Sequence, residues 1–256
     1  MTAGLIYELT KRDFTERYSG SVLGSAWSFI WPLVMIFIYM VIFSKIMSAR
    51  LPGNSSVYSY SIYLVAGVLP WTAFATTVSR SASVYIEKKN IISKVNISLL
   101  RLPMFIVFSE TVTFLFSMVL FFIFMVVTGE DVFSYKLFIL LFVFVLQQIF
   151  AYSIGLLFGI FSVFIKDLKE VLGVIMQVWF WFTPIVYVSS ILPESTTRFL
   201  KYNPSYYFIN AYQKIIAFRE YPDFNMLIQL ALISHIILIA AYIFFRALEK
   251  DIRDFI

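Results

Sequence analysis

Six long apolar stretches take up most of this chain, and the segments that join them are short. About 20 apolar residues in a helix cross the ~30 Å hydrocarbon layer of a membrane, and each stretch comes close to or exceeds that length. Helices are required because an unpaired backbone group is costly in lipid, and the alternation of a membrane barrel strand is absent. The predicted spans are Trp27–Met47, Tyr58–Val78, Leu102–Thr128, Leu137–Ile165, Val171–Val188 and Met226–Phe245.

The composition points the same way. The chain has 256 residues, of which 61% are hydrophobic and 14% charged, and its mean hydropathy is +0.86, whereas soluble domains carry roughly 25% charged residues. We therefore predict an all-α integral membrane protein with a single transmembrane domain over residues 1–256. The net charge of +5 reflects topology, and we expect no nucleic-acid partner.

Orientation follows from the distribution of basic residues. Cytoplasmic loops of membrane proteins carry an excess of Lys and Arg. Placing both termini in the cytoplasm puts most of the 20 Lys and Arg residues there, namely Lys11, Arg12, Arg17, Arg80, Lys88, Lys89, Lys94, Arg101, Lys166, Lys169, Arg246, Lys250 and Arg253. We predict a multi-pass protein with both ends inside.

Two segments on the cytoplasmic side have helical patterns. Within 1–26, Leu5, Ile6 and Leu9 share one helical face, which is typical of an amphipathic helix lying in the membrane interface; charge that only sets the topology explains the pattern equally well. Within 79–101, Val84, Ile91 and Val95 form an apolar stripe. This stripe predicts a cytoplasmic docking helix, or alternatively a helix resting on lipid.

The third segment, residues 189–225, is too apolar for a free loop, yet it is interrupted by Pro193, Pro204 and Pro222. Two short helices that dip into the outer leaflet and return account for both facts, because such backbone is tolerated where protein or water covers it. The alternative is a helical cap on the outer surface.

Catalytic patterns are sparse. None of the nine glycines begins the spacing of a P-loop, which cradles nucleotide phosphates. Glu110 and His235 each stand alone within a span, and a lone carboxylate in the membrane is costly unless it faces protein or water. With no Cys in the chain, a thiolate metal site is excluded. We expect no metal and no cofactor on this chain.

Three local motifs resemble those of one family. The first is the run from Arg17 to Trp27, RYSGSVLGSAW, followed by Trp31-Pro32; the second is KDLKE at 166–170 with WFWFTPIVY at 179–187; the third is Tyr202-Asn203-Pro204. Together they resemble the permease subunits of type-2 ABC transporters that export polysaccharides such as O-antigen, capsule or teichoic acid. The similarity extends over essentially the whole chain.

The resemblance implies an exporter of glycans carried on an isoprenoid pyrophosphate, in the inner membrane of a bacterium. Its partners would be a second copy of itself and two ATPase subunits, which bind ATP and Mg²⁺. It assigns Arg12 and Arg17 to the substrate pyrophosphate, and Glu87, Lys88 and Lys89 to the ATPase contact.

Aromatic faces suit a conduit for hydrated sugar, because flat rings pack on sugars while their polar groups bond hydroxyls. The preferred lining residues are Trp27, Trp31 and Tyr39. Two alternatives remain at this point. A secondary transporter would show internal repeats, and a membrane-embedded glycosyl- or phosphotransferase would show acidic or His clusters near the interface.

Overall fold

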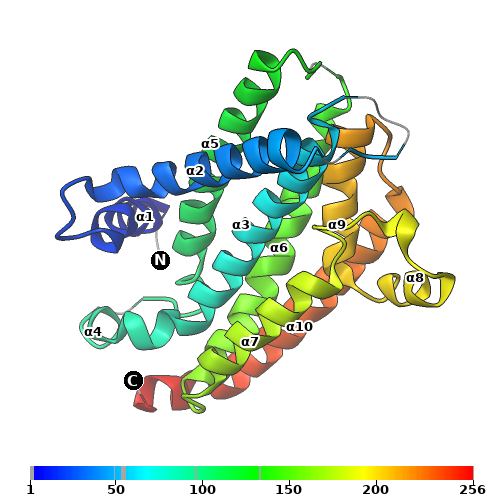
Figure 1. Cartoon of the computed structure of the whole chain (residues 1–256). Helices are drawn as coiled ribbons and strands as arrows, with labels where there is room; N and C mark the ends of the chain where they lie inside the picture. The colour runs from blue at the N-terminus through cyan, green and yellow to red at the C-terminus, as the bar shows by residue number, and fades with distance from the viewer. Residues whose placement is uncertain (1–2, 49, 53–55, 96, 133, 256) are drawn as a thin grey trace.

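The computed structural model describes residues 3–48, 50–52, 56–95, 97–132 and 134–255, and it contains helices and no strands in those ranges. The helices, labelled in Figure 1, are α1 (Ala3–Arg17), α2 (Trp27–Val41), α3 (Ser59–Glu87), α4 (Lys89–Ile92), α5 (Met104–Val127), α6 (Leu137–Ser162), α7 (Leu168–Phe182), α8 (Glu194–Leu200), α9 (Pro204–Gln213) and α10 (Phe224–Phe255). The predicted all-helical class is confirmed for the described residues.

Within the described ranges, five helical stretches are long and apolar enough to cross a membrane. They are Gly24–Ile46, which contains α2 and its flanking turns, and α3, α5, α6 and α10. These correspond to five of the six predicted spans. A chain with several such helices is a multi-pass membrane protein.

The predicted fifth span, 171–188, differs from the structure. Its helix, α7, has only 15 residues and ends at Phe182. The reason is Pro184, because the residue before a proline is pushed out of the helical region. Thr183 accordingly adopts φ −106° and ψ 130°, and the chain turns away from the helix axis there.

Helix α3 is the centre of the bundle. In its most apolar stretch 83% of the residues are buried, and it packs against α5, α6, α7 and α9. The closest approach is to α6, where a Cβ atom placed on Gly155 would lie 2.5 Å from Ser81 Cβ and one on Gly159 would lie 2.8 Å from the Ser81 carbonyl oxygen. Small residues at these positions allow the two helices to approach closely.

A second hydrophobic cluster joins the two ends of the chain. It contains Leu9 of α1, Tyr85 of α3, Phe105 of α5, Ile160 of α6 and Ile252 of α10, all buried. Figure 1 shows the N-terminus and the C-terminus on the same side of the molecule. Both termini therefore lie at one end of the bundle.

Helix α2 is the least buried of the long helices. Only 17% of the residues in its apolar stretch are covered by the rest of the chain, and large side chains such as Trp31 and Phe37 are more than half exposed. In Figure 1 it crosses over α3 and α5. Most of its apolar surface is left for lipid or for another protein to cover.

Part of the predicted docking segment, 79–101, belongs to a span helix. Helix α3 continues without a break to Glu87, since the sequence from Ser79 to Glu87 contains neither Gly nor Pro. The helix stops at Lys88, where φ is −98° and ψ is 18°, and the one-turn α4 follows. The apolar stripe is therefore split, with Val84 buried inside the bundle and Val95 exposed.

The predicted segment 189–225 contains the two short helices α8 and α9. Almost every residue of α9 is buried, and Phe208 packs with Phe74, 5.3 Å between ring centres. Asn203 caps α9: its Oδ1 accepts hydrogen bonds from Ser205 N at 3.1 Å and from Trp179 Nε1 at 2.7 Å. This cap joins the start of α9 to the end of α7.

Candidate functional site

Helix α1 lies against the bundle with a polar face turned inward. Leu9 is in the second hydrophobic cluster, and Phe14 stacks on Phe29 of α2, which in turn packs on Phe116 of α5 at 4.4 Å between ring centres. One and two turns beyond Leu9 are Asp13 and Arg17. Asp13 is only 6% exposed, so this helix buries a charge as well as an apolar face.

The charge is buried because it belongs to a cluster of two acids and two arginines. Arg17 Nη2 donates to Asp13 Oδ2 at 2.9 Å, to Glu110 Oε1 at 2.8 Å and to Ser109 Oγ at 3.1 Å. Arg80 Nη1 donates to Glu110 Oε1 at 2.6 Å, and Arg80 Nη2 donates to Asp13 Oδ1. Each carboxylate thus faces both guanidinium groups.

We call Asp13, Arg17, Arg80 and Glu110 the charge cluster. Its formal charges cancel, and it ties α1 to α3 and α5. Buried ions are tolerated when they are paired and hydrogen-bonded, whereas removal of one partner leaves an uncompensated charge at a cost of about 3–5 kcal/mol. The cluster therefore makes the position of α1 depend on all four side chains.

The charge cluster also sets the ionisation of Asp13. Burial alone raises the pKa of this carboxyl, but Arg80, the hydroxyl of Ser109 and Arg17 together outweigh it, and the pKa lies below its ordinary value of 3.8. Asp13 is therefore ionised at neutral pH. The same attraction, acting against burial, raises the pKa of Arg17 through Glu110 and Asp13.

A second link joins α1 to the far end of α3. Lys88 Nζ donates to Glu16 Oε2 at 2.7 Å and lies 5.6 Å from the centre of the Phe105 ring. Arg12 Nη2 donates to the other oxygen of Glu16 at 2.5 Å, and its side chain is 63% exposed. Hydrogen bonds from Lys88 and then Arg12 lower the pKa of Glu16.

A half-open cavity of about 440 Å³ lies beside the charge cluster, between α2, α3 and α5. Arg17 and Glu110 line one part of it, and Trp31, Met35 and Phe114 are among its apolar wall residues. Ser28 also lines it; this residue is 3% exposed and its hydroxyl has no hydrogen-bond partner in the described part of the chain. The cavity combines an edge formed by the ion-paired Arg17 and Glu110 with a largely apolar wall.

The turn from α1 to α2 requires glycine. Gly20 has φ +88° and Gly24 has φ +50°, a region that other residues adopt at a steric cost. Between them the chain bends back, and Trp27 Nε1 donates to Ser21 Oγ at 3.0 Å. The turn carries the chain from α1 into the first span.

The structure brings together some residues that the sequence singled out. Arg17 and Trp31, predicted for different roles, line the same cavity. Tyr39 lies further along α2, packed against Phe43 at 6.2 Å between ring centres, while Trp27 is at the start of α2. Trp27, Trp31 and Tyr39 therefore all lie on α2.

At the end of α3, the three predicted docking residues differ in environment. Glu87 and Lys89 are exposed, whereas Lys88 is partly buried in its contacts with Glu16 and Phe105. Ser83 Oγ donates to Glu87 Oε1 at 2.6 Å, leaving one carboxylate oxygen of Glu87 without a bond in the described residues. Glu87 and Lys89 are thus the more accessible of the three.

Sequence reasoning did not find the roles of Asp13, Arg80 and Ser109. One signal was present, since Glu110 is a carboxylate within an apolar span and therefore needs a partner. Its partners, Arg17 and Arg80, are separated from it by 93 and 30 positions. Nothing in the local sequence indicates which arginines they are.

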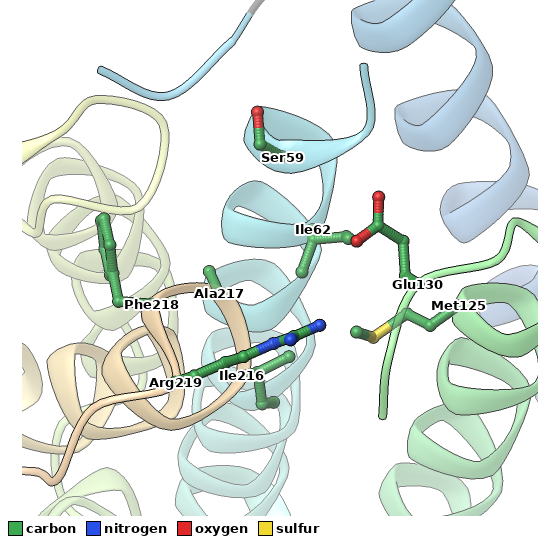
Figure 2. A pocket seen from close by; sticks show the side chains of 8 residues that line it. All are labelled: Ser59, Ile62, Met125, Glu130, Ile216, Ala217, Phe218 and Arg219. Carbon is green, nitrogen blue, oxygen red and sulfur yellow. The ribbon is translucent and has the colours of Figure 1, made fainter. Parts of the chain in front are cut away.

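A second pocket, of about 290 Å³, lies at the opposite end of α3. Figure 2 shows Glu130 and Arg219 reaching toward it from different elements, with Ser59 and Met125 nearby. Both charged groups already have partners: Ser56 donates to Glu130, and Arg219 Nη1 lies 3.3 Å from Asp131 Oδ2. The pocket is a polar opening at the end of the bundle away from the termini.

Within the described residues, apolar helices of membrane-spanning length and a flanking helix fixed by buried charges define a multi-pass helical membrane protein. The sequence comparisons agree, and the chain belongs to the ABC-2 type transporter family, which matches residues 4–217. It is similar to the O-antigen export system permease protein RfbA of Myxococcus xanthus, with 26% identity over 98% of this chain and 95% of that protein. A protein of the same name from Klebsiella pneumoniae is 28% identical over 78% of this chain and 75% of its own length.

Proposed function

We propose that this chain is the permease subunit of an ABC exporter that carries a lipid-linked polysaccharide across the inner membrane of a bacterium. The observation that carries the proposal is similarity over 98% of the chain to an O-antigen export permease. The multi-pass helical architecture supports it, because several helices that cross the membrane can together line a path through it.

The energy source is a separate subunit. The chain lacks a P-loop, and membership of the ABC-2 family implies an ATPase component, so we propose that ATP is hydrolysed on another chain. We propose that two ATPase subunits, each with ATP and Mg²⁺, contact Glu87, Lys88 and Lys89. The exposure of Glu87 and Lys89 at the end of the long helix α3 supports this contact.

A second copy of the chain completes the conduit. Helix α2 leaves most of its apolar surface uncovered, and aromatic side chains lie along it. We propose that the two copies of α2 border the path of the glycan, with Trp27, Trp31 and Tyr39 as lining residues. Rings of this kind offer a flat surface on which a sugar chain slides.

The lipid-linked end of the glycan is expected at α1. We propose that Arg12 and Arg17 contact the isoprenoid pyrophosphate, since guanidinium groups bind phosphate in a bidentate manner. The exposed Arg12 and the position of Arg17 at the wall of the cavity support this placement. Neither role requires a metal or cofactor on this chain.

The membrane topology is part of the proposal. Both termini lie in the cytoplasm, α7 with the residues after it forms a sixth crossing, and α8 and α9 form a re-entrant segment in the outer leaflet. The shared cluster of Leu9 and Ile252 supports a common side for the two ends, and the burial of α9 supports its insertion.

The deciding experiment removes the gene from its own host. We expect glycan still attached to isoprenoid pyrophosphate to accumulate on the cytoplasmic side, where added glycosidase reaches it only after the membrane is opened. Complementation with the intact chain restores export. Normal surface glycan without the gene would refute the proposal.

The contact with the ATPase is tested separately by co-purification. Glu87→Arg is expected to reduce the amount of ATPase recovered with the permease, because it reverses an exposed charge at the end of α3. The matched control is Glu220→Arg, an exposed Glu at the opposite end of the bundle. Equal recovery of the ATPase with both variants would exclude Glu87 from the contact.

A further inference from the structure

The charge cluster has a geometry that the proposed roles of Arg12 and Arg17 do not explain. If Arg17 served only as a phosphate ligand, one acid nearby would suffice to hold it. Instead Arg17 Nη2 is surrounded by three oxygens, from Asp13, Glu110 and Ser109. A guanidinium shared among three helical positions is fixed in place.

Arg80 completes the arrangement. Its two terminal nitrogens go to different helices, Nη1 to Glu110 of α5 and Nη2 to Asp13 of α1. The planar fork of arginine allows both bonds at once, whereas a lysine offers a single ammonium. Arg80 therefore connects α1 and α5 from a position on α3.

The link between Lys88 and Glu16 lies two turns beyond Arg80, at the residue that directly follows α3. Its bond of 2.7 Å gives α1 a second contact with this end of α3, in addition to that of Asp13 with Arg80. Because the Glu16 side chain is 42% exposed, the buried charge cluster is the stronger of the two attachments. Helix α2, in contrast, is joined to α1 by the glycine turn at 18–26 and by the stacking of Phe29 on Phe14, 6.3 Å between ring centres.

We infer that Asp13, Arg80 and Glu110 are positioning residues that clamp Arg17, so that α1, α3 and α5 move as one body. The role of this clamp in transport rests on the proposed function. Movement delivered by the ATPase to the end of α3 is then passed directly to Arg17, where the anionic end of the substrate binds.

The test measures the distance between α1 and α3 by electron paramagnetic resonance. Because the chain contains no Cys, nitroxide labels can be placed at two introduced cysteines, Tyr7→Cys on α1 and Ile86→Cys on α3. Both native side chains are exposed, 67% and 48%. The full chain is studied in lipid nanodiscs, and labelled chains are diluted with unlabelled chains so that only distances within one copy are recorded.

In the labelled background we expect one narrow distance distribution. Glu110→Gln is expected to shift it to longer distances and to broaden it, because the variant leaves two cations facing one carboxylate. A second variant, Arg80→Gln with Glu110→Gln, keeps the charges balanced but removes the bonds from Arg80 to α1 and α5. This double variant is used if Glu110→Gln alone fails to fold, and the same broadening of the distance distribution is expected.

The matched control is Glu249→Gln on α10, which removes a carboxylate from two loose ion pairs of 3.9 Å with Arg246 and Arg253. It is expected to leave the distribution narrow. A narrow, unshifted distribution in the folded double variant would overturn the inference. The distance is measured without substrate or transport. The inference and the export proposal can therefore fail independently of each other.

Discussion

The contact between α3 and α6 permits a sharp prediction about packing at two glycines one turn apart. An added methyl group on Gly155 would meet the side chain of Ser81, with Cβ at 2.5 Å and Oγ at 3.1 Å. A methyl group on Gly159 would meet the Ser81 carbonyl oxygen at 2.8 Å. One obstacle is a side chain that mutation can remove, and the other is backbone that no mutation removes.

The magnitudes follow from that difference. Overpacking of a close contact costs about 1–3 kcal/mol, and alanine recovers roughly 0.5–1 kcal/mol of helix propensity over glycine. Gly155→Ala and Gly159→Ala are each expected to destabilise the protein by about 1–2 kcal/mol after both effects are combined. The Ser81 hydroxyl has no partner in the described residues, so Ser81→Gly costs about 0.5 kcal/mol, mostly in helix propensity.

In the Ser81→Gly background the two glycine substitutions are expected to have different effects on stability. Gly155→Ala is expected to become neutral or stabilising, because the next atom it meets is Val78 Cα at an ordinary 3.5 Å. Gly159→Ala is expected to remain destabilising. The coupling free energy between Ser81 and Gly155 is then about 1–3 kcal/mol.

The assay is reversible unfolding in mixed micelles, followed by far-ultraviolet circular dichroism, with every variant measured at the same protein and detergent concentration. Gly173→Ala on α7 is the control, since an added Cβ there meets nothing within 4 Å, and it is expected to raise stability slightly. The reasoning would be refuted if Ser81→Gly removed the destabilisation caused by both glycine substitutions, or by neither of them.

Two further predictions concern polar contacts. Since the pKa of Asp13 lies below its ordinary 3.8, its ionised form stabilises the folded state fully above pH 3.8, and this contribution is lost as the pH falls below that value through the native pKa. Thermal midpoints measured from roughly pH 6 to pH 3 are expected to fall more steeply for the natural chain than for Asp13→Asn; equal slopes would contradict the assignment. Asn203→Ala removes the acceptor for Trp179 Nε1 and for Ser205 N, at an expected cost of about 1–3 kcal/mol, whereas Asn203→Asp keeps an acceptor and is expected to lose less in the same unfolding assay.

The sequence by itself determined the class of the protein and most of its spans. Apolar stretches of membrane length leave helices as the structure that satisfies the backbone, whatever the neighbours are. The composition, with 61% hydrophobic and 14% charged residues, indicated a membrane protein. The motif around Gly20 and Gly24 resembled the correct family, and both glycines have the positive φ that explains why they are there.

Element ends were predictable only where a local residue enforces them. Pro184 acts on Thr183 through a steric clash between neighbours, so the early end of α7 was present in the sequence even though an apolar window extended past it. The continuation of α3 through Arg80 to Glu87 was harder to predict, because hydropathy falls there while helical structure does not. Burial of Val84 and Tyr85 by other helices keeps that part ordered.

The candidate site was decided by tertiary structure. Arg17 was singled out for its motif and Glu110 for its isolation, yet the fact that they bond to one another depends on how α1 packs on α5. Arg80 and Asp13 join them only because α3 packs beside α5 and brings Arg80 within reach of both acids, although Arg80 and Asp13 are 67 positions apart in the sequence. An ion pair across helices depends on distances in space, and hydrophobic packing sets those distances. A sequence therefore shows that a buried charge needs a partner, and only the fold shows which residue that partner is.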